Sequence, residues 1–228
     1  ENHDIFNSIY PFFKGFLYQK NSIRKINSDI RTAFEIKGNI LFFSSARMSL
    51  YFLLSNIKIK EKKYVVVQSF TCGVVINSII RAGYIPLYVD IDPGNLGTSF
   101  ESFKVLYKNY SDSIRAVIVQ HSFGIPALIN KFVEFTRNKD IFLIEDCATT
   151  LGSKLNKTVC GNFGDASFWS FDSTKPLSIG TGGLLSIKNK NLYKCLNSKY
   201  NLLPTQSKKE FIFFSLCYFI SQFCHKFI

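Results

Sequence analysis

Short apolar runs alternate with amphipathic segments along most of this chain of 228 residues. From residue 41 onward this alternation is typical of βαβ units, which assemble into a mainly parallel sheet. The units do not repeat in sequence, so we expect a doubly wound α/β sheet rather than a solenoid. Ligands of such sheets bind outside the carboxyl ends of the strands. We expect strands over residues 64–67, 85–90, 114–120, 141–145, 166–171 and 183–187.

The segments between these runs carry apolar residues at helical spacing. We expect helices over residues 72–82, 99–110 and 126–138, and another that follows Ser45 and runs to about residue 55. Gly83 stands just past the first of these, where a helix commonly ends in a left-handed glycine.

The pattern divides the chain into three parts. Residues 1–40 form an N-terminal helical segment, residues 41–190 a large domain, and residues 191–228 a basic linker and an apolar helical tail. The tail, residues 211–228, has 13 apolar residues in 18 but too many polar interruptions for a confident membrane span. Two interpretations stay open, a helix that packs on the protein and a helix that lies on a membrane surface.

Composition narrows the class of protein. Hydrophobic residues make up 46% of the chain and charged residues 19%, which is typical of a globular protein. The net charge of +12 could attract anionic partners, but no nucleic-acid-binding motif accompanies it, so we expect none. The six cysteines lack metal-ligand spacing, and we expect most of them to be buried thiols. Without a signal-peptide pattern, the expected location is the cytoplasm.

The chemistry centres on Lys175 and Asp146. Lys175 lies between an aromatic-rich strand and a glycine cluster, where it is placed to condense with an aldehyde cofactor. Asp146 follows a buried apolar run, and a carboxylate there needs a cationic partner such as a protonated pyridine nitrogen. Together they predict pyridoxal 5′-phosphate. For Asp146 alone, a structural cap of the following turn remains an equal alternative.

Two hydroxyl-bearing segments could hold the cofactor phosphate. Ser45, Ala46 and Arg47 start a helix, whose N-terminal N–H groups and dipole favour an anion. Ser170 ends the strand before Lys175, where its hydroxyl could reach the same phosphate. An ordinary helix cap is the alternative interpretation of Ser45. The segment from Gln68 to Gly73 is placed to cover one face of the ring.

In this order, the motifs resemble those of the DegT/DnrJ/EryC1/StrS sugar aminotransferases, which are type I pyridoxal phosphate enzymes. The resemblance covers roughly residues 40–190. Its motifs here are Ser44-Ser45-Ala46-Arg47, Gln68-Ser69-Phe70-Thr71, Val89-Asp90-Ile91-Asp92-Pro93, the segment from Gln120 to Ala127, Glu145-Asp146-Cys147-Ala148, Gly161-Asn162-Phe163-Gly164-Asp165, and the Ser-Phe-x-x-x-Lys motif that ends at Lys175.

The resemblance implies transfer of an amino group from an amino acid, L-glutamate first among them, to a nucleotide-linked keto sugar in polysaccharide or deoxyaminosugar biosynthesis. Lys175 would hold the cofactor and move the proton, Asp146 would pair with the ring nitrogen, and Ser45, Ala46 and Ser170 would anchor the phosphate. Related dehydratases carry histidine in place of the lysine, so Lys175 favours amino transfer. The resemblance also implies a homodimer.

Two positions depart from the family pattern. Cys72 stands where an aromatic residue commonly covers the ring, and Thr149 where glutamine or histidine follows the aspartate. We expect both changes to weaken binding of the cofactor. We also expect most of the small C-terminal domain to be missing. The alternative function is therefore a truncated, catalytically incomplete family member that keeps the fold and is associated with a membrane through residues 211–228.

Overall fold

A computed structural model describes residues 21–204, 213, 216, 217 and 220 of the chain. Residues Ile30–Lys199 form one compact unit, and the other residues are assigned to a second unit. The tail at 211–228, with its expected membrane contact, lies almost entirely outside the described residues. No helix in the described ranges is both long and apolar enough to cross a membrane.

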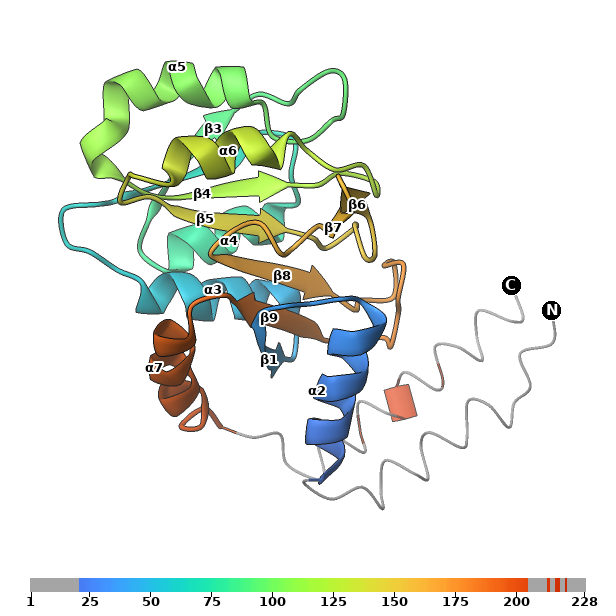
Figure 1. Cartoon of the computed structure of the whole chain (residues 1–228). Coiled ribbons are helices and arrows are strands. Elements are labelled where there is room, and N and C mark those ends of the chain that lie inside the picture. Colours follow the sequence, from blue (N-terminus) through green and yellow to red (C-terminus); the bar gives the residue numbers. More distant parts are fainter. Residues whose placement is uncertain (1–20, 205–212, 214–215, 218–219, 221–228) are drawn as a thin grey trace. The chain divides into compact units, whose positions relative to one another are not determined.

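The large unit is built on a seven-stranded mixed sheet (Figure 1). Five neighbouring strands run parallel, and β9 runs antiparallel to both of its neighbours. This architecture confirms the predicted α/β fold with a mainly parallel sheet. In sheet order the strands are β1 (Asn39–Phe43), β9 (Gly183–Ile187), β8 (Ala166–Ser170), β5 (Phe142–Asp146), β4 (Ile114–Gln120), β2 (Tyr64–Gln68) and β3 (Ile85–Val89).

Helices cover both faces of the sheet (Figure 1). Helices α3 (Ala46–Asn56) and α4 (Gly73–Arg81) pack together on one face. Helices α5 (Phe100–Tyr110) and α6 (Ile129–Thr136) cover the other. The remaining elements are α2 (Asn21–Ala33), the 3₁₀ turn η1 (Ser111–Ser113), the small hairpin of β6 (Lys154–Leu155) and β7 (Thr158–Val159), and α7 (Lys190–Tyr200).

The local sequence accounts for most of these elements. Val65, Val66 and Val67 are fully buried, because strand β2 lies between β4 and β3 and is covered on both faces. The rings of Phe103 and Phe132 pack 5.3 Å apart between the sheet and helices α5 and α6. Gly83 follows α4 with a φ of 81°, the left-handed conformation that glycine adopts without strain.

Several boundaries differ from expectation. Helix α6 begins at Ile129 rather than at residue 126, because the backbone N–H of Ala127 binds the His121 ring instead of entering a helical turn. Strand β5 extends one residue further and includes Asp146. The start of the expected basic linker forms helix α7.

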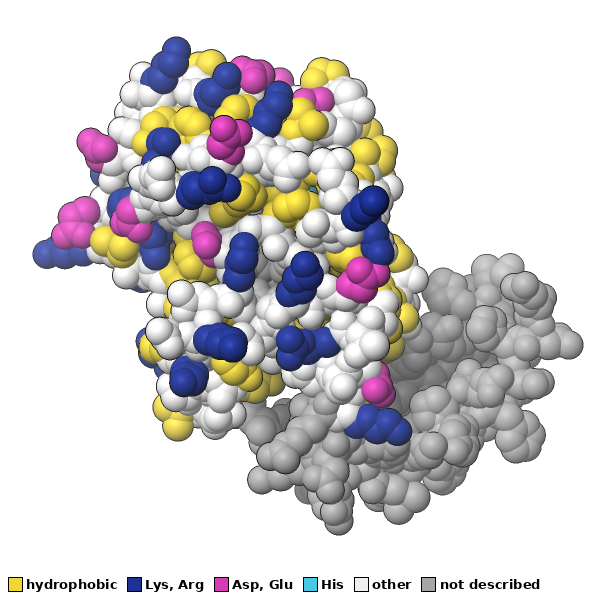
Figure 2. All heavy atoms as spheres, in the orientation of Figure 1, with side chains coloured by type: hydrophobic (Ala, Val, Ile, Leu, Met, Phe, Trp, Pro, Cys, Tyr) yellow, Lys and Arg dark blue, Asp and Glu magenta, His cyan; other side chains and the backbone are white. Residues whose placement is uncertain are grey.

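The expectation that most cysteines are buried is wrong for the described residues. Cys147 and Cys160 are buried, whereas Cys72, Cys195 and Cys217 are exposed. Cys72 is exposed because it lies where strand β2 has ended and α4 begins, at the edge of the sheet rather than inside it. On the face shown in Figure 2, lysine and arginine side chains are scattered among acidic and apolar ones rather than gathered into one patch.

Candidate active site

The predicted chemical residues meet at the carboxyl ends of β5 and β8. Asp146 is the last residue of β5 and pairs in register with Phe168 of β8, two residues before Ser170. Lys175 follows in a turn, in which its backbone N–H donates to Asp172 O at 3.0 Å. Parallel pairing of the two strands therefore brings the turn of Lys175 to the same sheet edge as Asp146.

Asp146 is a buried carboxyl group with an unusual pKa. Burial raises the pKa of Asp146 to about 6, and a hydrogen bond from the Ala148 N–H to Oδ1, 2.9 Å long, acts in the opposite direction. Positive charge at Lys175 also lowers this pKa, so its ammonium lies within electrostatic range of the carboxylate. The two predicted residues thus lie close enough to interact.

The loop after Lys175 is joined to the start of helix α3. The Thr181 hydroxyl donates to Ser44 O at 2.8 Å, and Ser45 pairs with Gly182 as an isolated parallel bridge. The Ser45 side chain caps α3 by accepting a hydrogen bond of 3.4 Å from the Met48 N–H. The cap interpretation of Ser45 therefore holds, and the same contacts bring the helix N-terminus to the lysine loop.

The other residues expected to hold the phosphate surround this junction. Ala46 is half-buried as the first residue of α3, and Arg47 is exposed next to it. Ser170 is half-buried at the end of β8, where its hydroxyl accepts a hydrogen bond of 3.4 Å from the Asp172 N–H. The first N–H groups of a helix lack helical partners and favour anions, so the junction is suited to a phosphate group.

The two residues that depart from the family pattern have different surroundings. Cys72 is exposed at the N-cap of α4, where its side chain makes no capping hydrogen bond. The hydroxyl of Thr149 donates to His121 O at 3.1 Å, so it is engaged with the protein.

A layer of amides and hydroxyls beside the site did not follow from sequence reasoning. Gln68 donates from Nε2 to Phe70 O at 2.6 Å and accepts at Oε1 from Thr98, at 3.0 Å. The Thr71 hydroxyl donates to Gln120 Oε1 at 2.7 Å. These contacts fix the segment after β2, which is expected to face the ring. Polar residues at the ends of β2 and β4 were the available signal.

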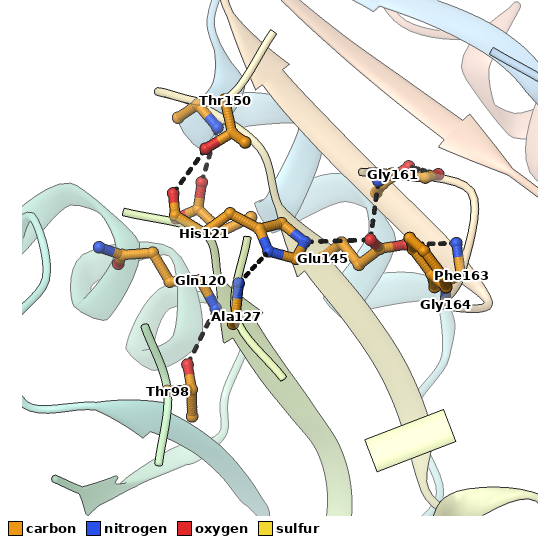
Figure 3. A network of polar contacts seen from close by, with 12 residues as sticks. Thr98, Gln120, His121, Ala127, Glu145, Thr150, Gly161, Phe163 and Gly164 are labelled. Carbon is orange, nitrogen blue, oxygen red and sulfur yellow. Dashed lines mark hydrogen bonds and ion pairs between the residues drawn. The ribbon is translucent and has the colours of Figure 1, made fainter. Parts of the chain in front are cut away.

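Sequence reasoning also missed a buried pair, His121 and Glu145 (Figure 3). Their Nε2 and Oε2 atoms are 3.1 Å apart. The backbone N–H groups of Gly161, Phe163 and Gly164 donate to the same carboxylate at 2.7 to 2.8 Å. The Gly-Asn-Phe-Gly segment therefore wraps a buried carboxylate. Potential metal-ligand atoms of His121, Glu145 and Cys147 lie within 4.8 Å of one another. However, the ring nitrogens of His121 and the carboxylate of Glu145 are already engaged in hydrogen bonds.

The residues present fit pyridoxal phosphate. Asp146 is a buried carboxylate that lacks a salt bridge among the described residues, as a partner for a pyridinium nitrogen requires. Lys175 supplies an amine within range, and the start of α3 supplies an anion site. Gly183 lets the backbone of β9 approach α3, since a Cβ there would lie 2.2 Å from Ala46 N.

A sheet of this order carries a lysine and a buried aspartate at its carboxyl edge, where α/β sheets bind their ligands. The chain belongs to the DegT/DnrJ/EryC1/StrS aminotransferase family, whose model matches residues 14–208.

Individual relatives agree with this assignment. GDP-perosamine synthase of Escherichia coli O157:H7 is 31% identical over 157 residues, which are 68% of this chain and 42% of the relative. The dTDP-4-dehydro-2,3,6-trideoxy-D-glucose 4-aminotransferase of Saccharopolyspora spinosa is 30% identical over 145 residues, 64% and 37% of the two chains. The chain thus spans about two fifths of the length of these relatives.

A solved structure shows the same fold. The GDP-4-keto-6-deoxy-D-mannose-3-dehydratase of E. coli, with bound hydrated PLP, matches with a TM-score of 0.74 at 17% identity. The match covers 92% of this chain and 59% of the dehydratase. Because a dehydratase shares the fold, the fold by itself does not select amino transfer.

Proposed function

We propose that this protein is a pyridoxal phosphate-dependent aminotransferase that acts on a nucleotide-linked keto sugar, with L-glutamate as the amino donor. The observation that carries the proposal is the placement of the two residues: the parallel pairing of β5 with β8 brings the buried Asp146 and the turn of Lys175 to the same edge of the sheet. A reactive amine beside a buried carboxylate suits a cofactor that bears both an aldehyde and a basic ring nitrogen.

Each residue then has a distinct role. The bound cofactor supplies a ring that accepts the electron pair released when the Cα–H bond of the donor breaks. The amine of Lys175 takes the proton from Cα of the donor and delivers it to C4′ of the cofactor. Asp146 keeps the ring nitrogen protonated. Ser45, Ala46, Arg47 and Ser170 hold the phosphate, Cys72 lies against the ring, and Thr149 contributes to the position of the turn after Asp146.

The substrate class is supported by the relatives. The names of all three proteins described above contain a nucleotide-linked sugar, and one of them is a 4-aminotransferase of a dehydro sugar. Lysine at position 175, where related dehydratases carry histidine, favours amino transfer over dehydration. The resemblance further implies a homodimer, and the cytoplasm remains the expected location.

Borohydride reduction tests the proposal. The protein is incubated with pyridoxal phosphate, reduced and digested, and the pyridoxyl-labelled peptide is identified by mass spectrometry. We expect the label on Lys175 and its loss in Lys175→Ala. Lys154→Ala is the matched control, because Lys154 is an exposed lysine that pairs with Glu35. Label on a different lysine, or unchanged labelling of Lys175→Ala, contradicts the proposal.

The alternative is a catalytically incomplete family member. Cys72 and Thr149 favour it, since both replace residues that commonly contact the cofactor. A single-turnover assay on the unreduced holo-protein separates the two functions: a protein whose Lys175 takes the label in the reduction experiment but which shows no substrate turnover supports the alternative. Formation of 2-oxoglutarate from L-glutamate together with an aminated nucleotide sugar supports the aminotransferase.

A further inference from the structure

We propose that His121 is a positioning residue for Asp146: its ring and backbone hold the cofactor aspartate and the turn after it in the place from which the carboxylate pairs with the ring nitrogen. The inference rests on the proposed function. His121 itself is completely buried behind the site.

Backbone contacts join His121 to Asp146 and its turn. The His121 N–H donates to Asp146 O at 3.1 Å, which continues the pairing of β4 with β5 past the end of the strands. The His121 carbonyl in turn accepts the hydroxyls of Thr149 and Thr150, at 3.1 and 2.7 Å. The aspartate and the turn that follows it are thus bound to one residue. Figure 3 shows the contact between His121 and Thr150.

Side-chain contacts fix the ring of His121. The Ala127 N–H donates to Nδ1 at 3.0 Å, so Nδ1 is an acceptor and the ring proton resides on Nε2. Nε2 then donates to Glu145, whose carboxylate accepts three backbone N–H groups in addition. These two contacts fix the orientation of the ring.

The carboxylate of Asp146 is held within the turn that follows it. Since Asp146 accepts its side-chain hydrogen bond from Ala148 within its own turn, the position of the carboxylate depends on that turn and therefore on His121.

Two substitutions separate the two ring contacts. In His121→Asn the amide oxygen can replace Nδ1 as acceptor for Ala127, whereas the donor to Glu145 is lost. In His121→Gln the amide nitrogen can replace Nε2 as donor to Glu145, whereas the acceptor for Ala127 is lost. Affinities are measured by titrating the apo form of the whole protein with pyridoxal phosphate and with its 1-deaza analogue, which has no ring nitrogen for Asp146 to pair with.

We expect each variant to bind pyridoxal phosphate about tenfold more weakly than the wild type, the size of a lost hydrogen bond to a charged group. Affinity for the 1-deaza analogue should stay unchanged. In an Asp146→Asn background the same His121 substitutions should leave the affinity for pyridoxal phosphate unchanged, because the residue on which they act is already neutral.

Other outcomes show whether the positioning role or the proposed function is wrong. Equal losses with both ligands, or a loss that persists beside Asp146→Asn, would show a general structural role and overturn the positioning role. A wild type that binds both ligands equally would instead refute the pairing of Asp146 with the ring nitrogen, and with it this part of the proposed function.

A milder variant covers the case in which neither His121 variant folds. Thr150→Val removes the hydroxyl that binds His121 O, while Thr150→Ser retains it. We expect about threefold weaker binding of pyridoxal phosphate alone for the valine variant, as for one neutral hydrogen bond, and wild-type affinity for the serine variant. Thr136→Val is the control for loss of a buried hydroxyl away from the site. Equal effects of Thr150→Val on both ligands overturn the proposal.

Discussion

Gly183 and Ala46 approach so closely that only glycine fits between strand β9 and helix α3: a Cβ on Gly183 would lie 2.2 Å from the Ala46 nitrogen. The same Cβ would lie 2.3 Å from the carbonyl carbon of Ser45. Both contacts are to backbone, which cannot move aside as a flexible side chain can. The proposed phosphate site therefore depends on a glycine that contacts no ligand itself.

Gly183→Ala should consequently displace the start of α3. We expect the free energy of unfolding to fall by about 1–3 kcal/mol, as for other overpacked sites, together with weaker binding of pyridoxal phosphate. Gly73→Ala is the control for the unfolding measurement, because a Cβ there meets nothing within 4 Å at the first residue of α4. Urea unfolding and cofactor titration measure both effects. Equal behaviour of the two variants would contradict the role of the contact.

Asp146→Asn should stabilise the apo form at high pH. The pKa of Asp146 is about 6 in the folded protein against an ordinary 3.8, so the folded state holds the proton more tightly than the unfolded state. Its contribution to stability is then largest below about pH 4 and is lost as the pH rises through 6. The difference between the two pKa values corresponds to about 3 kcal/mol in the free energy of unfolding. Urea unfolding should show a more stable variant at pH 8 and little difference at pH 4.

The same variant should lose most amino transfer, because a neutral amide cannot keep the ring nitrogen protonated. Unaltered turnover would remove Asp146 from the proposed mechanism. A variant less stable than the wild type at pH 8 would contradict the raised pKa.

Glu145→Gln should destabilise the protein strongly. Its buried carboxylate accepts hydrogen bonds from His121 and from three backbone N–H groups, so an amide nitrogen in place of one oxygen would face donors. We expect a loss of about 3–5 kcal/mol in the free energy of unfolding. Glu134→Gln, at an exposed position of α6, should change it by less than about 0.5 kcal/mol. A mild effect of Glu145→Gln would show that the loop relaxes around the amide.

Thiol alkylation should distinguish the cysteines. Burial raises the pKa of Cys160 to about 12 and that of Cys147 well above its ordinary value, so both should stay unmodified in the folded protein at pH 8. Exposed Cys72 should react, and pyridoxal phosphate should slow its reaction if the thiol lies against the ring. Cys195, exposed on α7, is the control. Peptide mapping after iodoacetamide treatment measures each rate, and equal rates for Cys72 with and without cofactor would place it away from the ring.

Local sequence patterns accounted for the elements and for the predicted residues at their ends. Such patterns act within one element, so they can be recognised from neighbouring residues. Examples are the valine run of β2, the hydroxyl caps Ser45 and Ser99, and the glycine after α4. The order of strands along the chain placed Asp146 and Lys175 at strand ends, where an α/β sheet binds ligands.

What the sequence by itself determined is therefore most of the elements, the fold class and the residues available for chemistry. Tertiary structure alone decided that β9 runs antiparallel between β1 and β8, that Gly183 contacts the start of α3, and that His121 and Glu145 form a buried pair. These relationships join residues from 24 to more than a hundred positions apart, as for Ser44 and Thr181 at 137. Hydrophobic periodicity records which side of an element is buried but not which distant group it meets, so such contacts exist only once the sheet has assembled.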